Sequence, residues 1–457
     1  MDTGKKATSN YAPKSGPRRD RRNRVQGRAM YKIRLSNFRC FAEDTPQVEV
    51  LPITFLVGEN SAGKTSFLAA TRIMLETFMP GALNPFNREP YRLGAFEQIA
   101  HWRGGRVGRA QRFCLEIVTP ISGVELCHKF TFGPGSPQPE LNEYEFAAED
   151  ATTTLKLSGN EASISITKGG KVLLQYTPER VPSPRLVRKD PSYVRYIFQD
   201  LIIDRPGEPE ELKVLRKQIH RQFNSSLRAR MQRNVFASAP IRSQPYRTYT
   251  PSEVLASAEG AHVPLEMAQQ KRLATETWNR SRESLNLFGK KSGLFNDIDI
   301  RLLGKKDGDP FQLTVKTGGP AMNIVDVGYG VSQALPIIYT LEQARQYEIY
   351  LLQQPEVHLH PRAQAELGTL IGRVSKQRPA GKVQLVETHS DYIIDRVRIE
   401  VGQKRIDHKM VTIVFFEKTD HGAKPTNIYL DENGELVDPP NHFRSFFLQE
   451  QRRLLGI

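Results

Sequence analysis

The stretch VGENSAGKTS, residues 57–66, has the residue types and spacing of a phosphate-binding loop. Gly58 and Gly63 allow backbone N–H groups to turn toward phosphate oxygens, and a helix that starts here adds partial positive charge. Lys64 can reach the β- and γ-phosphates of a nucleotide, and the Thr65 hydroxyl can ligate Mg²⁺. The pattern therefore predicts a site for ATP and Mg²⁺ formed by Asn60, Ser61, Gly63, Lys64, Thr65 and Ser66.

A second candidate is LLQQPEVHLHP, residues 351–361, where an apolar run ends in two amides. Enzymes that hydrolyse ATP usually place a magnesium-binding acid and a water-activating acid at such a point. Gln353 and Gln354 stand there instead, and an amide offers Mg²⁺ only a neutral oxygen. Glu356 follows two residues later and is an alternative base. We expect nucleotide binding to persist while the metal site is weakened and hydrolysis is slowed by orders of magnitude.

Four other polar residues are weighed against structural roles. His389 follows an apolar run in LVETHSD and is a candidate contact for the γ-phosphate. Gln98, in FEQIAHW, is a candidate for a magnesium-sensing loop, with a plain surface loop as the alternative. His358 and His360 have a spacing that could suggest a metal pair, but no third ligand is evident and we reject that interpretation.

The elements that would position these residues follow from hydropathy. An apolar strand ending at Val57 precedes a helix over 64–77. Segments separated by Gly and Pro indicate an antiparallel sheet; they are 112–120, 125–133, 154–159, 162–168 and 171–178.

Helical spacing of apolar residues predicts a helix over 210–233, followed by a second polar helix at about 264–286. The first of these helices would carry a basic face that either contacts nucleic acid or is simply solvated. That face consists of Lys213, Arg216, Lys217, Arg221, Arg228 and Arg230.

Composition limits the class of protein. The 457 residues carry a net charge of +15, and residues 1–28 alone hold nine basic and two acidic side chains. This segment predicts a disordered basic tail that either captures nucleic acid or an acidic partner or remains a solvated tail. No run approaches the ~20 apolar residues of a membrane span. The three cysteines have no metal-ligand spacing, which favours free thiols in a reducing cytoplasm.

Taken in order, the motifs resemble those of the ABC-type ATPase heads of the SMC, RecF and OLD superfamily. The similarity is to compact, stand-alone, AAA-type members, several of which belong to bacterial anti-phage systems. IRLSNFRCF is similar to the entry strand of that group and DVGYGVSQALPII to its signature segment. LLQQPEVHLHP and VETHSDYIID are similar to its Walker B and switch-histidine segments, and APIRSQPYRTY and YLDENGELVDPP are also typical.

The resemblance implies an α/β ABC-type ATPase head with mixed β-sheets, a P-loop NTPase core and a helical insertion. It also implies a head-to-tail homodimer, or a higher oligomer of dimers, in which ATP lies between the phosphate loop of one copy and the signature of the other. The signature would be Gly328, Gly330, Ser332 and Gln333, and His389 would be the switch residue. In compact relatives the doublet reads acid–Gln, so Gln353 is the departure; the implied metal positions are Thr65, Gln353 and Gln98.

The domains expected are a tail (1–28), an N-lobe with the phosphate loop (29–178), a helical insertion (179–290) and a C-lobe (291–457). Three functions remain open. The first is a regulatory ATPase of a bacterial defence module that controls a separate effector such as a nuclease. The second is a RecF-like DNA-repair ATPase that grips DNA through the tail and the helix at 210–233. The third is a scaffold that uses nucleotide only as structural glue.

Overall fold

The computed structural model describes most of the chain. The described residues are 29–79, 85–105, 108–178, 182–203, 205–231, 233–251, 257–343, 347–377, 381–441, 443–444 and 452–455. The predicted disordered tail, residues 1–28, lies outside them.

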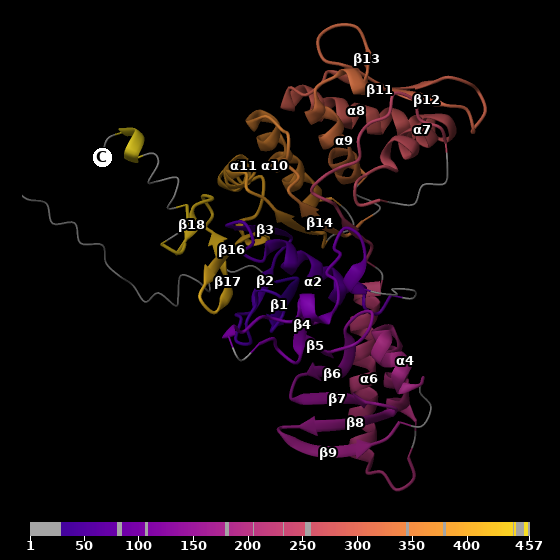
Figure 1. Cartoon of the computed structure of the whole chain (residues 1–457), viewed down its shortest axis with the longest axis vertical. Coiled ribbons are helices and arrows are strands. Elements are labelled where there is room, and N and C mark those ends of the chain that lie inside the picture. The colour runs from indigo at the N-terminus through magenta and orange to yellow at the C-terminus, as the bar shows by residue number, and fades with distance from the viewer. Residues whose placement is uncertain are drawn as a thin grey trace, which may run out of the picture.

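Three β-sheets organise the described chain, and Figure 1 shows them one above another. The first sheet is antiparallel and has the order β2-β1-β4-β5-β6-β7-β8-β9. Its strands are β1 (Tyr31–Ser36), β2 (Val48–Val50), β4 (Phe113–Ile121), β5 (Val124–Gly133), β6 (Glu140–Ala148), β7 (Ala151–Ser158), β8 (Glu161–Lys168) and β9 (Lys171–Tyr176).

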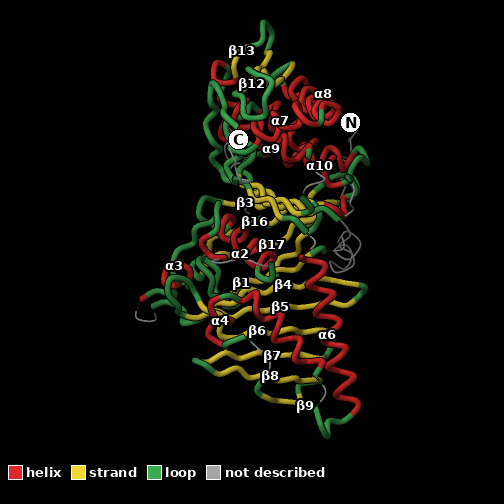
Figure 2. Tube along the Cα trace, turned by 90° about the vertical axis from the view of Figure 1, so that its right-hand side faces the viewer, coloured by secondary structure: helices red, strands yellow, loops and turns green. Residues whose placement is uncertain are grey.

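The second sheet has the order β10-β14-β15-β3-β16-β17-β18, and its first five strands are parallel. Helices cover both faces, with α2 on one side and α9 and α10 on the other (Figure 2). Strands buried on both faces read as continuous apolar runs, as in ITFLV and IYLL. The strands are β3 (Ile53–Gly58), β10 (Val235–Ala237), β14 (Ile349–Gln353), β15 (Val383–Glu387), β16 (Val411–Thr419), β17 (Gly422–Leu430) and β18 (Leu436–Val437).

The third sheet is a small antiparallel one, made of β11 (Asp297–Leu302), β12 (Phe311–Lys316) and β13 (Met322–Asn323). The α-helices are α2 (Lys64–Glu76), α3 (Phe96–Ile99), α4 (Pro184–Lys189), α5 (Val194–Ile197), α6 (Glu210–Met231), α7 (Val263–Leu273), α8 (Thr275–Ser292), α9 (Tyr329–Glu342), α10 (Pro361–Ser375) and α11 (Asp391–Gly402). In the described ranges, no helix combines the length and apolar character that crossing a membrane requires.

The mixed α/β class with a P-loop NTPase core is confirmed, because a parallel sheet carries the loop between β3 and α2. The segment 179–290, predicted to be one helical insertion, is instead divided between two sheets. Helix α6 runs along the first sheet, whereas β10 is an edge strand of the second sheet, next to β14. The run Val235–Ala237 is too short for hydropathy to mark it as a strand, and only its pairing with β14 defines it.

Two local predictions are wrong. The helix expected over 264–286 is two helices, since Ala274 leaves the helical region at φ −144° and ψ 62°. Arg216 was expected on a basic face that either contacts nucleic acid or is solvated, but only 1% of it is exposed. Its guanidinium donates to the carbonyls of Leu201 and Ile203 and pairs with Glu208, which satisfies the buried charge.

Helix α6 is held to the first sheet by aromatic packing. Phe223 is fully buried and stacks on Phe198 with ring centroids 4.2 Å apart. Its ring also meets those of Phe78 and Phe146 edge-on. Because these rings come from the turn after α2, from β6, from α6 and from the short helix before α6, the cluster joins four parts of the chain.

We expect Phe223→Ala to lower the free energy of unfolding by about 3–5 kcal/mol, the usual effect of a large cavity in a packed core. Val214→Ala, on the same helix but at a side chain that is 53% exposed, is the matched control and should change stability by less than about 0.5 kcal/mol. Denaturant unfolding of both variants measures the difference. Equal stability losses would mean that the cluster does not anchor α6.

Candidate functional site

The phosphate-binding loop joins β3 to α2, as its sequence predicts, and its two glycines are required by their surroundings. Gly58 has φ +141°, and a β-carbon there would lie 2.3 Å from the carbonyl oxygen of Phe416. Gly63 has φ +105°, and a β-carbon there would lie 2.7 Å from Cys40 Sγ and 2.8 Å from the Phe41 ring. Both positions therefore exclude side chains on grounds of backbone angle and of space.

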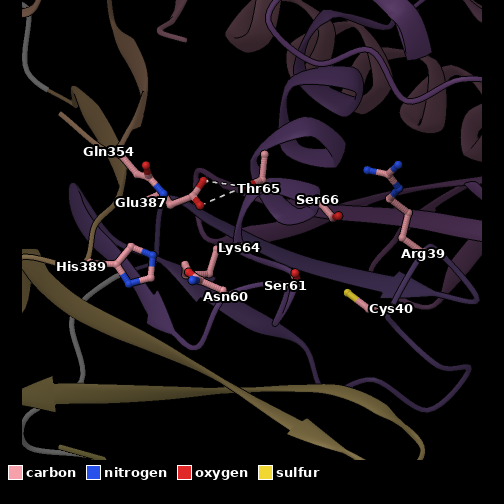
Figure 3. Close-up of a pocket in the computed structure, with 11 residues that line it drawn as sticks. Arg39, Cys40, Asn60, Ser61, Lys64, Thr65, Ser66, Gln354, Glu387 and His389 are labelled. Atoms are coloured by element: carbon pink, nitrogen blue, oxygen red, sulfur yellow. Dashed lines mark hydrogen bonds between the residues drawn. The ribbon is translucent and has the colours of Figure 1, made fainter. Parts of the chain in front are cut away.

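A cavity of about 350 Å³ lies over this loop (Figure 3). It brings together the start of α2, the segment after β1 and the ends of two neighbouring parallel strands. Carboxyl ends of parallel strands are where open α/β sheets bind ligands. The lining residues are Arg39, Cys40, Asn60, Ser61, Gly63, Lys64, Thr65, Ser66, Gln354, Glu387 and His389.

Lys64 is buried at the base of this cavity, with 4% of its surface exposed. Its Nζ donates to the carbonyl oxygens of Gly58 at 2.9 Å and of Glu59 at 2.8 Å. Burial lowers the pKa of the ammonium group, and the nearby Glu387 carboxylate opposes that shift. The lysine is thus a pre-positioned cation beside the N-terminal turn of α2, where phosphate oxygens would lie.

Thr65, in the first turn of α2, contacts the ends of two strands. Its hydroxyl donates to the Glu387 carboxylate, whose two oxygens both lie 2.9 Å from Oγ1 (Figure 3). Gln353 Nε2 donates to the same hydroxyl at 3.3 Å. Gln353 and Glu387 are direct partners in the β14–β15 ladder, so the two strand ends present an amide and an acid side by side.

Glu387 was not among the residues singled out from the sequence. It is 3% exposed, and burial raises the pKa of its carboxyl while the Thr65 hydrogen bond and Lys64 lower it. The signal that could have identified it is an acid that ends a fully buried apolar strand, VQLVE, immediately before the Thr-His pair. An ionisable group in that position needs a partner at the strand end.

His389 follows β15 and lines the cavity, and its contact with the γ-phosphate stays a prediction. Burial lowers the pKa of its imidazole, and the charge of Lys64 adds to this effect. Its backbone N–H donates to Glu356 Oε1 at 2.8 Å. Glu356 is 8% exposed and does not line the cavity; burial raises its pKa, and its Oε2 has no hydrogen-bond partner among the described residues.

Gln354 lines the cavity, with φ +43° and its N–H donating to the Glu387 carbonyl at 2.8 Å. The carbonyls of Gln353 and Gln354 both accept from Arg242, at 3.3 and 3.1 Å. Arg242 is 2% exposed, and its backbone N–H donates to Gln333 Oε1 at 3.2 Å. Arg242 therefore links the predicted signature helix, which its backbone N–H contacts, to the end of β14, which its buried guanidinium contacts.

The predicted signature residues lie at the start of α9 and do not line the cavity of their own chain. Ser332 Oγ donates to the Tyr329 carbonyl at 2.9 Å, within the first turn. Gly330 packs against the loop after β14, where a β-carbon would lie 2.7 Å from the His358 carbonyl. Gly328 is exposed, and a β-carbon there would meet nothing within 4 Å.

The remaining candidates, the two histidines after β14 and Gln98, have other roles in the structure. His360 caps α10 by accepting from the Arg362 N–H, and the His358 ring packs edge-on against Tyr329. Gln98 is exposed, its Oε1 accepts from the Ala95 N–H at 2.9 Å, and it does not line the cavity. Of the predicted metal positions, the structure thus brings Thr65 and Gln353 together but leaves Gln98 apart. Among the described residues there is also no cluster of three His, Cys, Asp or Glu that could hold a metal ion by itself.

Part of the chain is similar to a known protein family. Residues 205–395 match a family model described as "AAA domain, putative AbiEii toxin, Type IV TA system". This range includes the signature, the Gln-Gln doublet and His389, and it begins after the phosphate loop. This part of the chain is accordingly similar to an AAA-type domain. No curated protein sequence matches the chain.

Solved structures of SMC heads align with most of the chain at low identity. An SMC head bound to the C-terminal winged-helix domain of ScpA aligns over 88% of this chain and 98% of its own, with 13% identity and a TM-score of 0.47. A head from Pyrococcus furiosus covers 93% and 98%, with 11% identity and a TM-score of 0.45. A head from Thermotoga maritima covers 87% and 98%, with 12% identity and a TM-score of 0.39.

We expect Lys64→Ala to weaken ATP binding at least about 100-fold, because losing one partner of a buried charge pair costs about 2–5 kcal/mol. Lys404→Ala, at a lysine that is largely exposed, is the control and should bind as the parent does. Titration with a fluorescent ATP analogue measures both. Unchanged affinity of Lys64→Ala would place the nucleotide site elsewhere.

Proposed function

We propose that this chain is an ATP-binding regulatory ATPase in which nucleotide closes a head-to-tail dimer that controls a separate effector protein of a bacterial defence module. The observation that carries the proposal is the cavity over the phosphate loop, where Lys64, Thr65, Gln354 and His389 converge from two strand ends and one helix. The match of residues 205–395 to an AAA-type domain supports the same class of activity.

The cavity fits a nucleoside triphosphate held together with Mg²⁺. Lys64 and the N-terminal turn of α2 supply positive charge for the phosphates, and the Thr65 hydroxyl is a suitable oxygen ligand for a hard cation. Mg²⁺, when bound, would neutralise phosphate charge. Ser61, Ser66 and Asn60 add polar groups that can donate to phosphate oxygens.

Slow turnover follows from the groups around the place where water would attack. Gln354 lines the cavity but cannot accept a proton, since an amide is not a base at neutral pH. The Glu356 carboxylate receives the N–H of His389 and lies outside the lining. We therefore assign Glu356 to positioning the His389 loop, and we expect bound ATP to persist because its hydrolysis is slow.

Dimerisation is supported by the place of the signature segment. Gly328 and Tyr329 are exposed at the start of α9, with Tyr329 44% exposed, although neither contributes to the cavity of the same chain. A second copy is the partner that could bring this turn onto the phosphates. Arg242 would then connect nucleotide contacts at α9 with the end of β14 in the same copy.

The proposal of a separate effector protein rests on the description of the matching family. The description of the matching family names a putative toxin of a Type IV toxin–antitoxin system, and a toxin and its antitoxin are two separate components. A nucleotide switch that changes shape but performs its chemistry slowly suits the regulatory member of such a pair.

A RecF-like DNA-binding ATPase is the second candidate. It is favoured by exposed Arg221 and Arg228 on α6 and by the overall charge of +15. Such an electrostatic footprint gives affinity for nucleic acid that falls with salt.

In the presence of a slowly hydrolysed ATP analogue and Mg²⁺, we expect the parent protein to form dimers and Gly328→Glu to form them at least about 10-fold more weakly. The fold of one copy tolerates this change because the position is open, whereas a carboxylate buried at the interface without a partner costs several kcal/mol. Light scattering coupled to gel filtration measures the mass.

Gly319→Glu is the matched control, since its β-carbon also meets nothing within 4 Å and it lies beyond β12, away from α9. It should dimerise as the parent does. A parent protein that stays monomeric at saturating nucleotide would contradict the dimer proposal.

The two candidate functions differ in their response to salt. If the regulatory function is correct, the parent protein binds duplex DNA only weakly at 150 mM salt, with a non-specific dissociation constant on the order of 10⁻⁴–10⁻⁶ M. Arg221→Glu combined with Arg228→Glu then leaves that affinity unchanged. Tight duplex binding that weakens steeply with salt and is lost in this double variant would favour the DNA-repair function instead. Fluorescence anisotropy of a labelled duplex over a salt series measures this.

A further inference from the structure

One carboxylate reaches the phosphate loop from the strand next to it. Strand β15 lies between β14 and β3, so Glu387 at its end is one strand nearer to the loop than Gln353. Both Glu387 carboxylate oxygens are 2.9 Å from Thr65 Oγ1. Figure 3 shows the carboxylate pointing across the cavity wall at this hydroxyl.

The charge of Glu387 has no ion-pair partner in the described part of the chain. The nearest cation acting on it is Lys64, whose Nζ is occupied by two loop carbonyls. A second buried carboxylate, Glu356, lies close enough to act on it as a like charge. Buried carboxylates are normally paired with a cation or bound to a metal ion, so this arrangement lacks a positive group.

A bound triphosphate would increase this lack of positive charge. Its γ-phosphate would lie near Lys64 and Thr65, and would therefore add negative charge beside Glu387. One lysine cannot neutralise several phosphate oxygens together with a carboxylate. A divalent cation at Thr65 would remove the repulsion between the two anions.

Gln353, which occupies the position expected for the metal-binding acid, faces Thr65 with its amide nitrogen. An amide carries no charge and can offer a cation at most a neutral oxygen. Thr65 and Glu387 instead offer a hydroxyl and a carboxylate, the oxygen ligands that Mg²⁺ prefers.

We propose that Glu387 supplies the carboxylate of the Mg²⁺ site of this chain, from the end of β15, in place of an acid at the end of β14. The inference rests on the proposed nucleotide binding and deepens it. It also changes the expectation drawn from Gln353: the amide there does not leave the metal site without its negative charge, because the ladder partner of Gln353 carries that charge.

The test is the affinity of the full-length chain for a fluorescent ATP analogue, measured once with Mg²⁺ and once with EDTA. For Glu387→Gln we expect the gain in affinity that Mg²⁺ provides to fall roughly 10–100-fold, the usual effect of losing a group that supports a metal ligand. In EDTA the same variant should bind at least as tightly as the parent, because a carboxylate that repels phosphate has gone.

Two further variants sharpen the result. Glu400→Gln removes another buried carboxylate, paired with Arg405 on the far side of α11, and should keep the full Mg²⁺ gain. Glu387→Gln combined with Gln353→Glu exchanges the amide and the acid across one ladder pair, and should recover part of the gain. Mn²⁺ bound with ATP, followed by electron paramagnetic resonance, gives a second measure of the metal site.

The outcomes separate the two claims. A Glu387→Gln protein that keeps the parent's Mg²⁺ gain overturns the inference, and so does one that loses affinity equally in Mg²⁺ and in EDTA, which would show a structural role. In both cases ATP binding by the parent still supports the proposed function. A parent protein that binds no ATP under either condition overturns the proposed function, and this inference with it.

Discussion

The parallel pairing of β14, β15 and β3 is the constraint on which the site depends. Because the three strands run in the same direction, their carboxyl ends meet at one edge of the sheet, where the phosphate loop begins. The ladder places Gln353 directly beside Glu387, while Leu56 is the partner of Glu387 on the other side. Two residues that lie 288 and 322 positions after Thr65 in the chain thereby reach its hydroxyl.

Around that edge, the buried charges determine what the cavity can hold. Lys64 and Arg242 are buried cations, and Glu387 and Glu356 are buried acids, yet in the described part of the chain these four form no ion pair with one another within 4 Å. Arg242 instead donates to backbone carbonyls, and burial lowers its pKa to about 10. A site with fixed charges of both signs suits a ligand that itself combines phosphate groups with a cation.

Much of the fold was predictable from local pattern. The apolar run before Gly58 and the helix after Gly63 have the predicted positions, and most strands of the first sheet were recognised from alternation. Strand β6 was not, and β10 was not, because a strand of three residues has no periodicity to detect. The break at Ala274 and the burial of Arg216 depend on neighbours distant in sequence, which hydropathy does not report.

By itself, the sequence determined the phosphate loop, since its glycines, Lys64 and Thr65 act within ten consecutive residues whose spacing alone defines the geometry. It also marked Gln353 as an amide where an acid is usual. The tertiary structure decided which acid stands beside Thr65: Glu387 is hidden in the sequence as the end of an ordinary apolar strand. Its role follows from strand order and register, which depend on contacts between distant segments and not on local composition.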